Sequence, residues 1–510
     1  MVQTAVSVVE VCLFGIGLYI FKRLFYSRRH SPLPPGPAGW PVIGNLFQVP
    51  FEKTWEALAA LGKTYGHISS LSSLGRRFVV LNSSEAISGV LEKQSSKCSS
   101  RPHSTMASEL VGFNNGMLFM DDSDRFRQYR KLFNRSFGNR NSTAAFNPAE
   151  EEETRKFLCS VLQKPENLVD HICKCSPAGA IVLKTIYGYT VQQGRDPFIE
   201  LARKVITIFS LVEAPGAFLF NVIPAIRYIP KWFPGMRFLK DAKKHNQFLA
   251  DSILKPHQYV LDQMAAGTAI PSFSSTLLDE GVSREEEEAI MCTSMSVFIG
   301  TSDTLVSAIH AFFLAMVLFP EVQTKARAEL DEVVGSGRLP SISDRDFLPY
   351  VKAVCQEVLR WHSITPIAIP HVATEDIYYD GFLIPKGSWI IGNAWAVLHD
   401  ESIYPDPSVF RPERFLGETP QPQPQKVCFG FGRRTCPGSH LAEESLFITV
   451  AMSLAVLAIS KEVVDGVQVT PKVDVTSGVV SHPKPFRYQI TARSPAAEAL
   501  LRGSSSFALT

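Results

Sequence analysis

Near its carboxyl end the chain reads Phe429-Gly430-Phe431-Gly432-Arg433-Arg434-Thr435-Cys436-Pro437-Gly438, and this is the most informative stretch of the sequence. Gly432 and Gly438 are expected to let the backbone turn tightly and approach a flat group, because glycine has no Cβ. A helical pattern begins directly after Gly438. Its free N–H groups and positive dipole end would point at the Cys436 sulfur and lower the pKa of the thiol. The sequence therefore predicts a thiolate at Cys436.

This stretch resembles the haem-binding loop of the cytochrome P450 superfamily. The pattern Phe-x-x-Gly-x-Arg-x-Cys-x-Gly is matched by Phe429, Gly432, Arg434, Cys436 and Gly438. The resemblance implies a mainly α fold with a small β-sheet region, and a haem b whose iron takes the Cys436 thiolate as axial ligand. Arg434 would neutralise a haem carboxylate. A thiolate ligand favours cleavage of the O–O bond. The alternative is a glycine-rich loop with a buried free cysteine.

A second feature lies inside a long helical pattern. Ser283 and Glu286 form a capping box, and the pattern runs to Phe319, before Pro320. It is apolar almost all round, which is typical of a central helix or a membrane span, and the polar residues in its middle favour the central helix.

Those polar residues are Gly300-Thr301-Ser302-Asp303-Thr304. They resemble the oxygen-activation segment of the superfamily, although Thr301 stands where a glycine is usual. The resemblance implies that Asp303 and Thr304 relay protons to bound dioxygen. The alternative is a polar helix packed in the core.

Further charged residues match other motifs of the superfamily. Glu357 and Arg360 share one face of a helix expected to start near residue 348, and Arg414 follows in Pro-Glu-Arg-Phe. The resemblance implies that these three form a buried ion network behind the haem. Arg130 and His371 occupy positions where the superfamily binds the haem propionates, and the alternative for both is a surface charge.

The amino terminus predicts a membrane anchor. Residues 2–21 are mostly apolar and long enough to span a bilayer, and basic residues follow them. A cleaved signal peptide would place its charges before the apolar run. We therefore expect an uncleaved anchor at 2–21, a basic and proline-rich hinge at 22–45, a haem-thiolate domain at 46–493 and a loose tail at 494–510. The catalytic domain would face the cytoplasm from the endoplasmic reticulum membrane.

Composition excludes other classes. The net charge is +2, and no basic run interleaved with aromatics indicates nucleic-acid binding. The nine cysteines are irregularly spaced, which is typical of reduced thiols.

Local patterns predict the remaining elements. Strands are expected at 78–81, 377–379 and 382–384, with Asp380-Gly381 as a hairpin turn and all three in one small sheet. The acidic run 150–153 is interpreted as a solvated helix start. Helices are predicted at residues 54–64, 124–137, 150–162, 196–212 and 238–264.

The resemblance also indicates the substrate. The pocket walls would come from residues 105–119, 209–220, 298–301, 364–369 and 476–480, which are mainly apolar and hold no evident cationic clamp. A lipophilic small molecule is therefore expected, with a terpenoid first and a polyketide or indole second. A patch at residues 228–235 is interpreted as dipping into the membrane interface.

The chain has no dinucleotide-binding motif and no fused flavin segment, so electrons from NADPH would come through a membrane-bound haemoprotein reductase, with cytochrome b5 as an alternative donor. The basic residues expected to dock the reductase are Arg127, Lys131, Lys426 and Arg433. The predicted reaction inserts one atom of dioxygen into the substrate. The alternatives are a haem-thiolate isomerase or dehydratase, a haem carrier or sensor without turnover, and a membrane receptor without cofactor.

Overall fold

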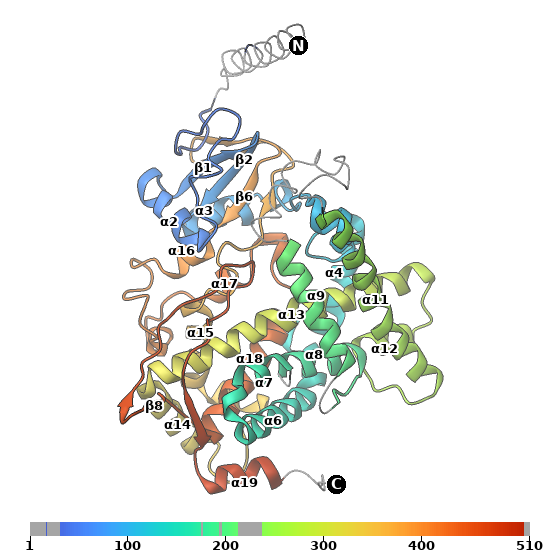
Figure 1. Cartoon of the computed structure of the whole chain (residues 1–510), viewed down its shortest axis with the longest axis vertical. Coiled ribbons are helices and arrows are strands. Elements are labelled where there is room, and N and C mark those ends of the chain that lie inside the picture. The colour runs from blue at the N-terminus through green and yellow to red at the C-terminus, as the bar shows by residue number, and fades with distance from the viewer. Residues whose placement is uncertain (1–16, 18–30, 175–176, 193–195, 213–236, 504–510) are drawn as a thin grey trace.

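The longest helix of the described chain, α13 (Arg284–Leu318), runs through the middle of the molecule (Figure 1). The computed structural model describes residues 17, 31–174, 177–192, 196–212 and 237–503. The predicted capping box begins α13, because the Ser283 hydroxyl accepts from the Glu286 N–H and the Glu286 carboxylate accepts from the Ser283 N–H. Among the described residues, only α13 is long and apolar enough to span a membrane, and 78% of its apolar window is buried inside the protein. The prediction of a central helix is confirmed.

The other helices of the described chain surround α13 or cover the sheets, and most of the predicted ones begin and end close to the expected residues. They are α2 (Thr54–Tyr65), α3 (Ser84–Ile87), α4 (Asp124–Phe137), α5 (Arg140–Thr143), α6 (Asn147–Gln163), α7 (Leu168–Lys174), α8 (Pro177–Tyr187), α9 (Pro197–Val212), α11 (Arg237–Ala265), α12 (Phe273–Leu278), α14 (Pro320–Val333), α15 (Pro349–Trp361), α16 (Ala394–Leu398), α17 (Gln425–Cys428), α18 (Ser439–Val456) and α19 (Pro495–Gly503).

The largest core cluster joins α13 to α15, α18 and α6. Phe312 and Phe313 of α13 and Phe447 of α18 are almost fully buried within it. Like α13, α18 is apolar on every side, so neither helix has a face suited to water. This packing places α18, and the loop that precedes it, against the middle of α13.

Within the described part of the chain, the strands form four small sheets at the edges of the helical body. The largest has the order β1-β2-β6-β3, formed by β1 (Ile68–Ser73), β2 (Arg76–Leu81), β6 (Trp389–Gly392) and β3 (His371–Val372), and it lies toward the amino-terminal end of the molecule (Figure 1). The two-stranded sheets pair β4 (Ile377–Tyr379) with β5 (Phe382–Ile384), β7 (Leu457–Ser460) with β10 (Gln489–Ala492), and β8 (Val463–Val464) with β9 (Val467–Gln468).

The predicted hairpin is confirmed, but its place in the sheet was wrong. Asp380 and Gly381 both have positive φ, as a two-residue hairpin turn requires. However, β4 and β5 pair only with each other, whereas β2 pairs with β1 and β6. The parallel partner of β2 lies more than 300 residues downstream, a pairing that no local pattern reveals.

Two further predictions were wrong. The end of the chain is not loose throughout, because α19 packs on α6, Leu501 is buried, and the Leu501 carbonyl oxygen accepts from Arg155 Nη1 at 2.7 Å. The acidic run is not a fully solvated helix start either: α6 begins at Asn147, and Glu150 and Glu153 are buried on its inner face.

Several predicted segments lie outside the described residues. These are the anchor at 2–21 apart from residue 17, residues 22–30 of the hinge, residues 213–220 of the pocket wall, the aromatic patch at 228–235 and residues 504–510 of the tail.

Glu150 creates a pH dependence of stability. Burial and the nearby carboxylate of Glu444 raise its pKa well above the ordinary value, and the Ser445 hydroxyl, at 3.2 Å from Oε2, lowers it only in part. The folded protein therefore keeps a proton that the unfolded chain releases. Above the ordinary glutamate pKa, this difference lowers the free energy of unfolding by about 1.4 kcal/mol per pH unit, until the folded pKa is reached.

We expect Glu150→Gln to remove this dependence, because the amide has the shape of the protonated acid and no proton to lose. The variant should match the wild type below about pH 4 and be more stable near neutral pH, as measured by thermal unfolding across that range. Glu56→Gln, on the exposed side of α2, is the matched control. Parallel pH profiles of wild type and Glu150→Gln would contradict the prediction.

Candidate active site

The loop that carries Cys436 connects α17 to α18. Gly432 has φ +56°, and a Cβ built there would lie 2.3 Å from the Leu91 carbonyl oxygen, so the predicted need for glycine holds at this position. The Cys436 N–H donates to the Phe429 carbonyl oxygen at 2.6 Å, which closes the loop behind the thiol.

Gly438 plays a different part from the one predicted. Its φ of −86° is open to any residue, and it forms the N-cap of α18. A Cβ there would lie 4.0 Å from Cys436 Sγ, so glycine keeps the space beside the sulfur free.

The Cys436 thiol faces an internal cavity. The helix start acts in the predicted sense, because the Gly438 N–H hydrogen-bonds the sulfur and lowers its pKa, as does the charge of Arg130. Burial is the larger cause and raises the pKa of Cys436 above its ordinary value. The side chain has open surface, but that surface borders the cavity that it lines.

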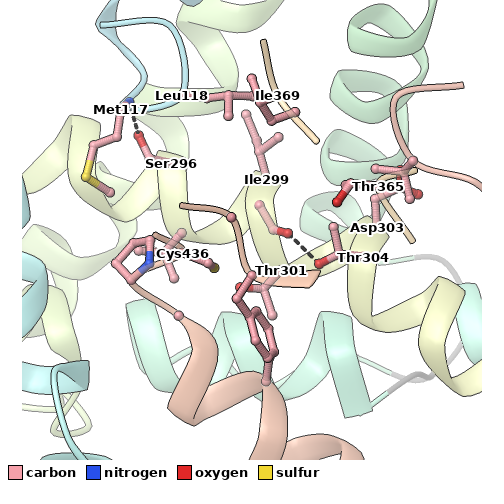
Figure 2. A pocket seen from close by; sticks show the side chains of 18 of the residues that line it. Met117, Leu118, Ser296, Ile299, Thr301, Asp303, Thr304, Thr365, Ile369 and Cys436 are labelled. Carbon is pink, nitrogen blue, oxygen red and sulfur yellow. Dashed lines mark hydrogen bonds between the residues drawn. The ribbon is translucent and has the colours of Figure 1, made fainter. Parts of the chain in front are cut away.

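The cavity has a volume of about 320 Å³ and mostly apolar walls (Figure 2). Each of the five predicted wall segments contributes side chains to it, including Leu118, Phe209, Ile299, Ile369 and Val480. Beside Gly300 a Cβ would meet nothing within 4 Å, so the cavity reaches the backbone of α13 there.

Three phenylalanines gather at one part of this wall. The ring centroids of Phe113, Phe119 and Phe209 lie 5.8 to 6.0 Å from one another, and all three residues line the cavity. Such rings offer a broad apolar surface to a ligand.

Four basic side chains line the same cavity, and none of them forms an ion pair within the described part of the chain. Burial lowers the pKa of Arg101 to about 9 and of Arg434 to about 10, and it lowers the pKa of Arg130 as well. Burial and the charges of Arg101 and Arg434 hold the pKa of His371 well below its ordinary value. Charged groups crowded together in this way favour an anionic partner.

The hydrogen bonds of these side chains leave donors free. Arg434 donates to the carbonyl oxygens of Ser99, Met117 and Met120, and it lies 3.8 Å from the centre of the Phe126 ring. Three of its five donors are thus used.

Arg130 Nη1 donates to the Thr435 carbonyl oxygen at 2.7 Å, which ties α4 to the Cys436 loop. His371 Nδ1 contacts the Cys98 carbonyl oxygen at 2.8 Å, which leaves Nε2 for another partner.

Arg101 was not predicted. Its Nη1 donates to the carbonyl oxygens of Ile369 and Pro370, but its buried Nε has no partner among the described residues. In the sequence Arg101 is a single basic residue in a polar loop, and only the approach of a segment nearly 270 residues away buries it.

Asp303 and Thr304 both line the cavity, as predicted, but they do not contact each other through a hydrogen bond. Thr304 Oγ1 donates to the Gly300 carbonyl oxygen at 2.7 Å (Figure 2), and Asp303 Oδ1 lies 3.1 Å from His482 Nε2. Thr301 leaves the helix intact, since α13 continues unbroken through this segment.

The predicted ion network is present in full. Glu357 accepts two bonds from Arg360, at 2.9 and 2.8 Å, and one from Arg414 Nε at 3.1 Å. The Arg411 N–H adds a further bond at 2.9 Å, and the three charged side chains are at most 1% exposed. The network joins α15 to the segment that leads to α17.

The residues expected to dock a reductase lie near that loop. Arg127, Lys131 and Arg433 line one shallow depression, and Lys426 is exposed on α17. Asp122 pairs with both Arg127 and Arg433, at 3.1 and 3.0 Å, so part of the positive charge is compensated.

Comparison with known proteins assigns the family. The cytochrome P450 family model matches residues 34–490. Cytochrome P450 monooxygenase 208 of Postia placenta is 43% identical over 98% of this chain and 97% of that protein. Cytochrome P450 monooxygenase claR of Ampulloclitocybe clavipes is 42% identical over 98% of this chain and 93% of that protein. O-methylsterigmatocystin oxidoreductase of Aspergillus flavus is 35% identical over 96% of this chain and 93% of that protein.

The chain therefore belongs to the cytochrome P450 superfamily, in its fungal secondary-metabolism type, and is a monooxygenase of the oxidoreductase class. The family implies a haem-thiolate iron cofactor, a redox partner that supplies electrons and a lipophilic substrate. The residues present fit that cofactor: a cysteine thiol, three arginines and a histidine line one cavity, and the partnerless buried Nε of Arg101 fits a carboxylate of the haem.

We expect Glu357→Gln to destabilise the protein by about 3–5 kcal/mol, because Arg360 and Arg414 would then be buried without a counter-charge. Thermal unfolding of the haem-loaded protein measures the loss. The matched control is Glu498→Gln, which breaks an exposed pair with Arg502 and should change stability by about 0.5 kcal/mol or less. Equal losses of stability in the two variants would show that the buried network contributes no more than an exposed ion pair.

Proposed function

We propose that Cys436 is the axial ligand of a haem b and that the enzyme inserts one oxygen atom into a lipophilic secondary metabolite. The observation that carries this proposal is the Cys436 thiol on an apolar cavity that α13 also borders at Gly300 and Thr304. When bound, thiolate-ligated haem iron activates dioxygen for cleavage of its O–O bond.

In this reaction the residues of the chain hold the cofactor, exclude water and supply protons. Arg101, Arg130, Arg434 and His371 would hold the haem carboxylates, which would supply negative charge beside the buried arginines. The apolar walls exclude water from the reacting atoms.

Asp303 and Thr304 supply protons on the substrate side of the cavity. A bound iron would stabilise the Cys436 thiolate, which burial alone disfavours.

A terpenoid is the first candidate substrate, and a polyketide or indole is the second. The cavity walls are apolar, and the ring cluster of Phe113, Phe119 and Phe209 suits a rigid, bulky hydrocarbon. Within the described residues the only carboxylate on the cavity is Asp303. The Aspergillus flavus relative is named for its action on O-methylsterigmatocystin, so we keep the second candidate beside the first.

The setting of the enzyme is part of the proposal. An anchor at residues 2–21 would hold the domain on the cytoplasmic face of the endoplasmic reticulum membrane. Electrons would come from NADPH through a membrane-bound reductase, with cytochrome b5 as an alternative, and the donor would dock at the basic depression around Lys131 and Arg433.

We expect Cys436→Ser to abolish the thiolate spectrum of the ferrous carbon monoxide complex and the NADPH-dependent oxidation, because a serine oxygen is not a thiolate donor. Cys428→Ser, at the end of α17, is the matched control. Absorption spectroscopy of the two purified variants tests the expectation. A thiolate spectrum in Cys436→Ser would refute the assignment.

The same spectra identify the substrate. We expect terpenoid hydrocarbons to shift the Soret band of the ferric protein by displacing water from the iron, whereas fatty acids leave it unchanged. A shift with polyketides or indoles alone would exclude the terpenoid proposal and keep the monooxygenase.

A further inference from the structure

The carboxylate of Asp303 is engaged by a residue far along the chain. His482 Nε2 lies 3.1 Å from Asp303 Oδ1, while the Thr304 hydroxyl bonds back to Gly300. Consecutive residues on a helix do not face each other, so Thr304 is poorly placed to hold this carboxylate. The partner of the cavity acid is therefore His482, from the segment between β9 and β10.

Backbone contacts fix the position of His482. Its N–H donates to Thr476 Oγ1 at 2.9 Å. The preceding residue, Ser481, accepts at its carbonyl oxygen from Ser307 Oγ at 2.5 Å. Ser307 lies one helical turn beyond Asp303, on the same face of α13. Ser481 and His482, which are adjacent in the turn, therefore contact Ser307 and Asp303, which lie one helical turn apart on α13.

This turn also forms part of the cavity wall. Val479 and Val480 line the cavity directly before Ser481 and His482. This turn therefore contacts both the cavity and the carboxylate of Asp303.

The pair extends from the cavity to a partly exposed side chain. The His482 side chain is 25% exposed and that of Asp303 is 18% exposed, and Asp303 lines the cavity. Within the described residues His482 Nδ1 has no hydrogen-bond partner. An imidazole can accept a proton at one ring nitrogen and release one from the other.

The neighbouring titratable groups do not compete for this role. His310 and His362 are the other histidines beside His482, and burial lowers the pKa of His310 to about 4 and of His362 to about 3. Both stay neutral at physiological pH. His362 is held by the Ser307 hydroxyl and the Ser481 carbonyl oxygen.

We propose that His482 is the positioning residue of Asp303, holding the carboxylate at the cavity and passing protons from solvent to it. The inference rests on the proposed role of Asp303 as a proton donor. With styrene as a probe, the reductase-driven reaction is styrene + O₂ + NADPH + H⁺ → styrene oxide + H₂O + NADP⁺. The peroxide-driven reaction is styrene + H₂O₂ → styrene oxide + H₂O, and it takes up no proton.

The first test is His482→Gln, whose side-chain amide can still donate to Asp303 but cannot carry a proton. We expect the reductase-driven epoxidation of styrene to fall about tenfold, at or below the low end of what positioned acid–base groups contribute. Hydrogen peroxide released per NADPH should rise, and the peroxide-driven epoxidation should stay within twofold of the wild type. Lys484→Gln, which removes an ion pair with Asp474 in the same segment, is the matched control and should keep both reactions.

The outcomes separate this inference from the proposed function. Equal losses in the two reactions would mean that His482 only supports the fold, and no loss in either would also overturn the proposal. If Asp303→Asn leaves the reductase-driven reaction intact, the proposed relay itself is wrong. If Asp303→Asn impairs it and His482→Gln does not, only the role of His482 is lost.

A second measurement needs no turnover. Thermal unfolding of His482→Leu, Asp303→Asn and the double variant forms a double-mutant cycle. We expect the double variant to lose less than the sum of the single changes, because each change breaks the same contact. Additive shifts would show that the pair does not form and would overturn the inference.

Discussion

A single buried carboxylate, that of Glu357, holds together the part of the molecule on which the site depends. It accepts from two arginines and from one backbone N–H, and so joins α15 to the segment that leads to α17 and Cys436. A charge of this kind is stable without water only when all its partners are present. The network thus fixes the segment that precedes the Cys436 loop, and the Phe429 carbonyl oxygen and Arg130 hold the loop itself.

The cavity that the Cys436 thiol faces differs from the Glu357 network, because in the described part of the chain its basic side chains are not paired with carboxylates. It collects Arg101, Arg130, Arg434 and His371 against apolar walls and holds one carboxylate among its described residues, Asp303. The arginine charges of this cavity therefore suit a bound group that carries carboxylates, and the buried Arg101 Nε has no partner among the described residues. A haem held there would bring negative carboxylates for the arginines and iron for the sulfur.

The helix α13 forms part of the hydrophobic core and also part of the wall of the candidate active site. Its apolar residues bury it on nearly every side, while Gly300, Asp303 and Thr304 open onto the cavity. The Thr304 hydroxyl bonds to the Gly300 carbonyl oxygen of the preceding turn, and the Asp303 carboxylate contacts His482. The chemistry of this segment therefore involves a segment near the carboxyl end as well as the helix itself.

Local sequence determined the elements and the chemistry of the cysteine loop. The capping box at Ser283, the hairpin turn at Asp380 and the spacing around Cys436 act over a few residues, and the structure bears out the elements that they predict. Resemblance to a family added the network of Glu357, whose members lie far apart in the chain. Tertiary structure alone decided the burial of Glu150, the docking of α19, the partnerless Nε of Arg101 and the pairing of His482 with Asp303. Each of these depends on segments that meet only after folding, and the loss of water at such contacts sets charge and pKa in a way that local periodicity does not reveal.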